Sequence, residues 1–73
     1  MKKQDYTKKR RILSSKLVEA REKAGLTQKQ VAETGIITQS ELSKLENGSR
    51  KVDFLFLLEL AKLYNQTLTF FIP

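Results

Sequence analysis

Residues that start and end helices recur along this chain at short intervals. They divide it into a few helical segments, which together can form only a small domain. Glycines at positions 25, 35 and 48 each follow a stretch of helical period, and Thr27, Thr38 and Asp53 stand where the next stretch begins. Thr and Asp accept hydrogen bonds from the free amides of a helix N-terminus, and Gly adopts the left-handed backbone that ends a helix. The pattern predicts a first helix from Asp5 or Thr7 to Gly25 and three shorter ones, at 28–33, over about nine residues from Thr38, and at 54–64.

The spacing of apolar residues supports the same fold. Along the first segment, an apolar stripe of helical period consists of Tyr6, Leu13, Leu17, Ala20 and Ala24. Leu42 and Leu45 form the apolar pair of the third segment. The C-terminal segment 67–72 is β-branched and aromatic, which favours a strand, but Thr67 is also a good N-cap for one more helical turn. The sequence therefore predicts an all-α, compact bundle of four to five helices in a single domain, 1–73, with a short C-terminal helix or, alternatively, a strand.

The composition excludes several classes of function. The 73 residues contain no Cys and no His, so disulfides, thiolate sites and the commonest zinc ligand and general base are excluded. We expect no metal, no cofactor and no enzymatic activity. The longest apolar run, residues 54–58, is far below the ~20 residues that span a bilayer, and no apolar region typical of a signal peptide follows the basic N-terminus. We therefore expect no membrane association and a cytoplasmic protein.

The positive charge is concentrated near the N-terminus. The net charge is +6, and residues 1–24 carry all of it, because residues 25–73 hold five basic and five acidic side chains. Such a run is either a solvated face with a flexible leader or a surface that binds phosphates or a membrane. Charge alone leaves both alternatives open.

A longer pattern resembles a known family. Thr27-Gln28 precedes Val31-Ala32, Thr38-Gln39 opens the third segment, Glu46-Asn47-Gly48 closes it, and Leu60-Ala61-Lys62 follows. These spaced features, over about residues 13–72, resemble the phage-repressor, Cro-like (xenobiotic-response-element) helix-turn-helix family. The resemblance implies a DNA-binding domain with the helix-turn-helix at 27–47, a recognition helix in the major groove and, as in the family, a homodimer.

The turn between the second and third helices departs from the family pattern. The family usually places an apolar residue before the turn glycine, whereas here Gly35 comes first and Ile36 follows. Either the second helix ends early and Ile36 packs into the vacated apolar site, or a small cavity is left at Gly35.

The third helix has a polar arc without carboxylates. On a helical wheel Leu42 and Leu45 define the buried side, and Glu41 and Glu46 flank it. The opposite arc suits base edges, because Gln can both donate to and accept from adenine and Lys can donate to guanine. By resemblance, the residues that read bases are Gln39, Ser40, Ser43 and Lys44.

Other residues take roles that the resemblance implies. Arg21 and Glu46 are expected to form a structural ion pair between the first and third helices. Contacts with DNA phosphates are expected at the helix N-termini and the loop after the third helix, by Gln28, Thr38, Asn47, Arg50 and Lys51. Capping and solvation are the alternative for Gln28 and Gln39.

The fourth helix is more apolar than one core requires. Its apolar side chains fill an arc of about 220°, whereas packing on one core needs little more than 100°. We expect residues 53–72 to form a dimerisation region, and the alternative is a single core wrapped by the C-terminus. The predicted interface residues are Phe56, Leu63, Phe70 and Ile72.

The sequence favours a sequence-specific, dimeric DNA-binding transcription regulator, most simply a repressor that reads a pseudo-palindromic operator with helix 38–47. Two alternatives bind DNA through the same helices. One is an antitoxin that also binds a protein toxin, for which a strand at 66–72 would allow pairing with the partner. The other is the controller protein of a restriction-modification operon.

The basic N-terminus is a separate prediction. We expect residues 1–6 to form a flexible arm and residues 1–11 to be frayed in the free protein. Four consecutive cations, Lys8 to Arg11, repel one another and lie near the positive end of the helix dipole. The hypothesis is that this segment becomes ordered against the DNA backbone.

Overall fold

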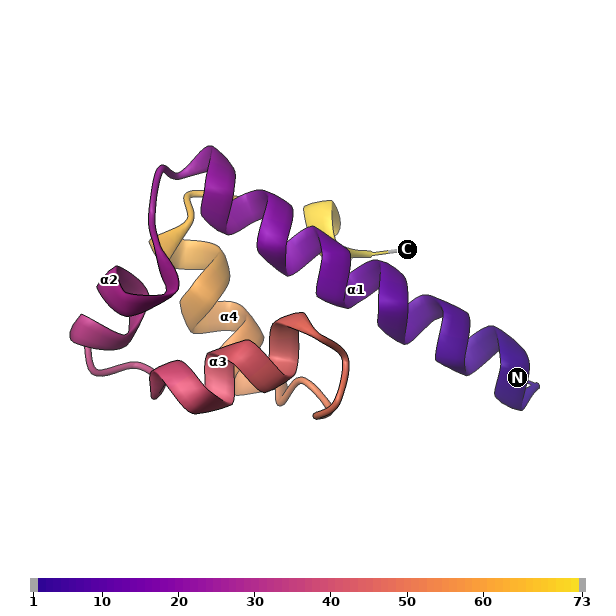
Figure 1. Cartoon of the computed structure of the whole chain (residues 1–73). Coiled ribbons are helices and arrows are strands. Elements are labelled where there is room, and N and C mark those ends of the chain that lie inside the picture. The colour runs from indigo at the N-terminus through magenta and orange to yellow at the C-terminus, as the bar shows by residue number, and fades with distance from the viewer. Residues whose placement is uncertain (1, 73) are drawn as a thin grey trace.

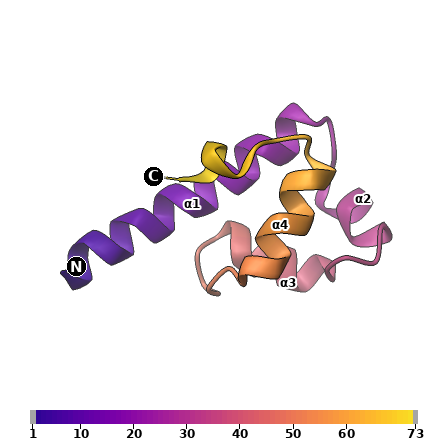
Figure 2. The same ribbon diagram turned by 180° about the vertical axis from the view of Figure 1, so that it is seen from behind.

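The computed structural model describes residues 2–72 and is helical throughout its regular elements. These are α1 (Lys3–Lys23), α2 (Gln28–Glu33), α3 (Gln39–Glu46), α4 (Phe54–Leu63) and a 3-10 turn, η1 (Leu68–Phe71). In the views of Figures 1 and 2, α2, α3 and α4 lie on one side of α1, and η1 lies beside its middle. The predicted all-α bundle is confirmed.

The start and end signals act as the sequence predicts for α2 and α3. Thr27 Oγ1 accepts a hydrogen bond from the Gln30 amide at 3.1 Å, and the Gln30 side chain accepts one from the Thr27 amide at 2.9 Å. Thr38 and Glu41 form the same reciprocal arrangement at the start of α3. Asp53 stands at the N-cap of α4 but makes no side-chain cap bond. Local capping therefore fixes both helices of the helix-turn-helix.

Every element contributes to one core. Leu42 and Leu45 of α3 are fully buried, as predicted, but within the apolar stripe of α1 only the middle is buried, since Tyr6 is 43% exposed. The buried apolar side chains are Leu17, Ala20, Val31, Ile37, Leu42, Leu45, Leu60, Ala61, Tyr64 and Phe71. α1 and α2 pack on α3, and side chains of α4 and η1 belong to the same core, so the position of α3 is determined by the whole core.

The turn between α2 and α3 resolves the unusual order of its residues. α2 ends at Glu33, and Gly35 adopts a left-handed backbone with φ of +82°, which a side chain would strain. Ile36 packs against the core while partly exposed, and the next residue, Ile37, is buried at 4% exposure. Ile36 and Ile37 thus both contact the core after the turn glycine.

Three expectations for the ends of the chain are wrong. α1 begins at Lys3 rather than after a cap at Asp5 or Thr7, and Thr7 instead donates to the Lys3 carbonyl at 3.0 Å. Residues 3–11, expected to be frayed in the free protein, are helical and form the first turns of α1. The mobility of the expected arm, 1–6, stays a prediction, and its Met1 lies outside the described residues. The strand alternative for 67–72 also fails, because residues 68–71 form η1, whose Phe71 is buried against the core.

Candidate nucleic-acid interface

The residues predicted to read bases share one face of α3. Gln39, Ser40 and Lys44 are exposed and Ser43 is partly buried. Leu42 and Leu45 fix this orientation, because they hold the opposite face of the helix in the core. The exposed face presents an amide, two hydroxyls and an ammonium group, all of which can hydrogen bond to base edges.

Both carboxylates of α3 are engaged within the protein. Glu41 forms an ion pair with Arg50 at 2.7 Å and accepts a hydrogen bond from the Thr38 hydroxyl at 2.8 Å. Glu46 forms an ion pair with Arg21 at 2.7 Å. Neither acid leaves a free negative charge beside the polar face, so the face does not repel an anionic partner.

The Arg21–Glu46 pair is bidentate and largely buried. Arg21 Nε donates to Glu46 Oε2 at 2.7 Å and Nη2 donates to Oε1 at 3.1 Å, and the two side chains are 14% and 6% exposed. Arg21 Nη1 also donates to the Leu26 carbonyl at 2.8 Å. The hydrogen bond to Glu46 raises the pKa of Arg21, so the guanidinium stays charged. The predicted structural pair is present and joins α1 to α3.

Gln28 faces this pair instead of pointing outward. Its Nε2 donates to Glu46 Oε1 at 2.8 Å, in a partly buried position. A direct contact between this NH2 group and a phosphate would require the bond to Glu46 to lengthen or break. The sequence identified Gln28 as a phosphate ligand; in the structure it ties α2 to the α1–α3 ion pair, and its phosphate role stays a prediction.

The loop after α3 holds the remaining predicted phosphate ligands. Asn47 accepts a hydrogen bond from the Ser49 amide at 2.9 Å, and Lys51 is exposed with its ammonium 5.9 Å from the centre of the Tyr6 ring. Arg50 is held by Glu41 and lies over the Phe56 ring at 5.8 Å. Arg50, with Thr38, holds the pKa of the Glu41 carboxyl below its usual range. Of these residues, Lys51 is the most freely available to an anion.

A contact that the sequence analysis missed fixes this loop to α1. Arg10 Nη2 donates to the Gly48 carbonyl at 3.2 Å, and Ser14 is buried beside the same glycine. A groove lies between this part of α1 and residues 50–52, with Tyr6, Leu13 and Val52 among its lining residues. Arg10 lies one turn from Leu13 and two turns from Leu17, so its place on the apolar side of α1 was the signal for this contact.

The predicted dimerisation residues differ in exposure. Phe56, Leu63 and Phe70 are partly buried and pack against the core. Phe70 is further covered by Lys16 and Lys23, whose ammonium groups lie 4.9 and 5.3 Å from its ring centre. The large apolar side chains most exposed to solvent are Leu55 (67%), Ile72 (63%) and Phe54 (58%). The apolar surplus of α4 is thus at its first turn rather than around Leu63.

Two other features, a metal-ligand cluster and a membrane-spanning helix, are absent from residues 2–72. They contain no cluster of three or more acidic side chains able to hold a metal ion. Among these same residues, no helix is long and apolar enough to cross a membrane.

Comparison with known proteins identifies this arrangement. The family model described as Helix-turn-helix matches residues 17–71. The chain belongs to the helix-turn-helix family. The family predicted from the sequence, with phage repressors among its members, is confirmed, and its two namesake helices are α2 and α3. The match leaves the first sixteen residues of the chain outside the helix-turn-helix region.

A curated relative adds to this identification. The chain is 47% identical over 53 residues to the HTH-type transcriptional regulator ImmR of Bacillus subtilis (strain 168). The match covers 73% of this chain and 42% of that protein, so the chain spans about two fifths of the relative's length. No solved structure matches.

Tyr64 adds an unusual group near the ion pair of the helix-turn-helix domain. Its hydroxyl is buried and has no hydrogen-bond partner among the described residues. Burial, and secondarily the charge of Glu46, raises the pKa of Tyr64 from 10.0 to about 12. The folded protein therefore keeps this phenol protonated at a pH where the unfolded chain loses the proton.

This shift predicts a loss of stability in alkali. Between pH 10 and 12 the unfolded state binds fewer protons at Tyr64 than the folded state, so the free energy of unfolding falls with rising pH, by about 2–3 kcal/mol in total. Urea unfolding across this range should show a shallower fall for Tyr64→Phe than for the wild type. Tyr6→Phe, which removes an exposed phenol, is the matched control and should behave as the wild type. Equal slopes for wild type and Tyr64→Phe would contradict the assignment.

Proposed function

We propose that this protein is a sequence-specific double-stranded-DNA-binding transcription regulator that reads its operator with α3. The observation that carries the proposal is the exposed polar face of α3, whose neighbouring carboxylates are both held in ion pairs with arginines. Membership of the helix-turn-helix family and the name of the regulator from Bacillus subtilis support it. The function requires binding without catalysis, and it places the protein in the compartment that holds the DNA, the cytoplasm of a bacterial cell.

The roles within α3 follow from its side-chain chemistry. Gln39 can form two hydrogen bonds with one adenine, and Lys44 can donate to the acceptors of guanine in the major groove. Ser40 and Ser43 are short, which allows the helix backbone to approach the bases closely. The N-terminal turn of α3 is directed into the groove in this arrangement, as in the docking geometry of repressors.

The residues around α3 position it on the backbone. Thr38 lies at the N-terminus of α3, and Asn47, Arg50 and Lys51 lie at its C-terminal exit, so phosphates on both sides of the groove would be held. Arg50 serves this role while paired with Glu41, and Gln28 serves it through the free amides at the start of α2. These contacts carry no sequence information and set the register of the protein on the duplex.

Base reading by α3 can be tested directly after operators are selected from a random pool of duplexes. Gln39→Ala and Lys44→Ala should each weaken binding to the selected operator by about 1–3 kcal/mol and relax the preference at one base pair. Lys51→Ala is the control for a phosphate contact and should weaken all sequences about equally. Quantitative binding to operators substituted at each position checks this. A Gln39→Ala protein with an unchanged preference at every position would show that α3 does not read the bases.

We further propose that the regulator is a homodimeric repressor. The exposed first turn of α4, with Phe54 and Leu55, offers an apolar surface that a second copy would cover, together with Ile72 of the C-terminal segment. Phe56, Leu63 and Phe70 are partly buried, and their remaining exposed atoms would add to this surface. A dimer would bind two half-sites about 34 Å apart, and where such an operator overlaps a promoter, its occupation would block transcription.

The dimer is tested at its most exposed residue. Leu55→Asp should yield a folded monomer. Its operator binding should be much weaker, because each monomer then binds one half-site without the support of a second subunit on the other. Sedimentation gives the mass and circular dichroism checks the fold. Tyr6→Asp, which changes an exposed side chain of α1 outside residues 53–72, is the control and should remain dimeric. A wild-type protein that sediments as a monomer at high micromolar concentration and binds one half-site would refute the dimer.

A further inference from the structure

The N-terminal half of α1 is a helical extension beyond the helix-turn-helix region. The family match begins at residue 17, whereas α1 begins at Lys3, and Figures 1 and 2 show its N-terminal turns projecting away from the other helices. Residues 2–11 hold six basic side chains and a single acidic one, Asp5. Much of the protein's net charge is therefore carried on a projecting helix.

Among residues 2–72, no acidic side chain forms an ion pair with these cations. The ion pairs among residues 2–72 are Arg21–Glu46, Lys23–Glu19 and Arg50–Glu41, so none involves a cation of residues 2–11. Cations in the first turns of a helix also lie at the positive end of its dipole, which disfavours them. Apart from Arg10, which bonds to the Gly48 carbonyl, contacts within the protein therefore give no reason for this concentration of charge, whereas binding to an external polyanion does.

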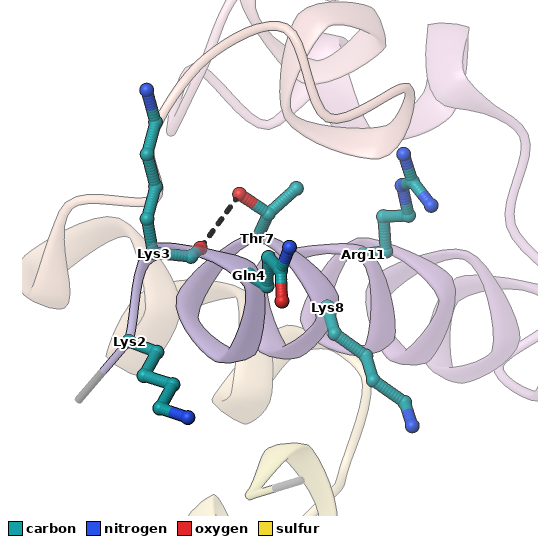
Figure 3. A pocket seen from close by; sticks show the side chains of 6 residues that line it. All are labelled: Lys2, Lys3, Gln4, Thr7, Lys8 and Arg11. Atoms are coloured by element: carbon teal, nitrogen blue, oxygen red, sulfur yellow. Dashed lines mark hydrogen bonds between the residues drawn. The ribbon is translucent and has the colours of Figure 1, made fainter.

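The cations of the extension are divided between two sides of α1. Lys3 lies eighteen residues, or five full turns, before Arg21, so both side chains leave α1 in the direction of α3. Arg11 lies on the same side, because it is one turn before Ser14, which faces the Gly48 loop. Figure 3 shows Lys3, Thr7 and Arg11 pointing to one side of the helix, and Lys2 and Lys8 pointing to the other. We call Lys3, Thr7 and Arg11 the α3-side row.

The opposite side carries a matched set of cations. Lys9 lies seven residues before Lys16, so the two side chains point in nearly the same direction. Lys16 lies over the Phe70 ring of η1, with its ammonium 4.9 Å from the ring centre. Lys9 and Lys16 therefore belong to the η1 side of α1, away from the face that α3 presents.

We propose that the α3-side row binds phosphates of the DNA backbone just outside the base pairs that α3 reads. The proposal rests on the proposed function. The Arg10–Gly48 hydrogen bond fixes the extension beside the exit loop of α3, and Lys51 of that loop lies next to Tyr6. At 1.5 Å per residue the row is about 12 Å long, so it continues the line of phosphate contacts from the exit loop along the backbone. The extension is thus a preformed helical contact.

Two charge-matched variants separate this contact from the general effect of charge. Lys3→Gln/Arg11→Gln removes two cations from the α3-side row, and Lys9→Gln/Lys16→Gln removes two from the η1 side. Binding to the selected operator with flanking duplex is measured against salt concentration by fluorescence anisotropy. Each lost phosphate contact reduces the magnitude of the slope of log affinity against log salt by about 0.9. The first variant should lose about 2 in slope per subunit, and the second less than half a unit.

A shortened duplex gives an independent readout. On a duplex trimmed to the base pairs that α3 reads, the two variants should show the same slope, and circular dichroism should show that both keep α1 helical. If the wild type binds operators with a sequence preference but the two variants have equal slopes on the long duplex, the α3-side row is merely solvated and only this inference fails. If the wild type binds no duplex with a preference, the proposed function fails as well.

Discussion

One carboxylate, that of Glu46, joins three helices of this domain. It receives two hydrogen bonds from Arg21 of α1 and one from Gln28 of α2, while its own backbone belongs to the last turn of α3. Only 6% of its side chain is exposed, so loss of a partner would leave a buried charge unpaired. The angle between the two helices of the helix-turn-helix, and the position of both against α1, therefore depend on the charge and hydrogen bonding of this one residue.

The proposed recognition surface depends on the same arrangement. Because Glu46 points inward to Arg21 and Glu41 is held by Arg50, the outward side of α3 keeps only groups that an anion tolerates. The loop that leaves α3 is in turn fixed to α1 by Arg10, so α1 and α3 present their polar sides as one rigid surface. A protein that holds its binding groups in place before it meets DNA loses little conformational entropy on binding. This rigidity links the core to the proposed readout.

Features set by local chemistry could be predicted from the sequence, and features set by tertiary packing could not. The caps at Thr27 and Thr38 and the buried Leu42 depend on neighbouring residues alone, so pattern and spacing were sufficient. The Arg21–Glu46 pair came from the family resemblance. The inward turn of Gln28 and the pairing of Arg50 with Glu41 depend on groups brought together only by the fold. The start of α1 at Lys3 was also missed: Thr7 bonds to the carbonyl four residues before it and therefore lies inside the helix rather than at its cap.

A double-mutant cycle on Arg21 and Glu46 tests the central claim most directly. Urea unfolding would give the free energies of unfolding of the wild type, Arg21→Met, Glu46→Met and the double variant. We predict that Arg21→Met, which leaves Glu46 buried without its partner, loses about 3–5 kcal/mol, and that the double variant loses clearly less than the sum of the two single losses. Losses that add within about 0.5 kcal/mol would show that the two residues act independently and would contradict the account.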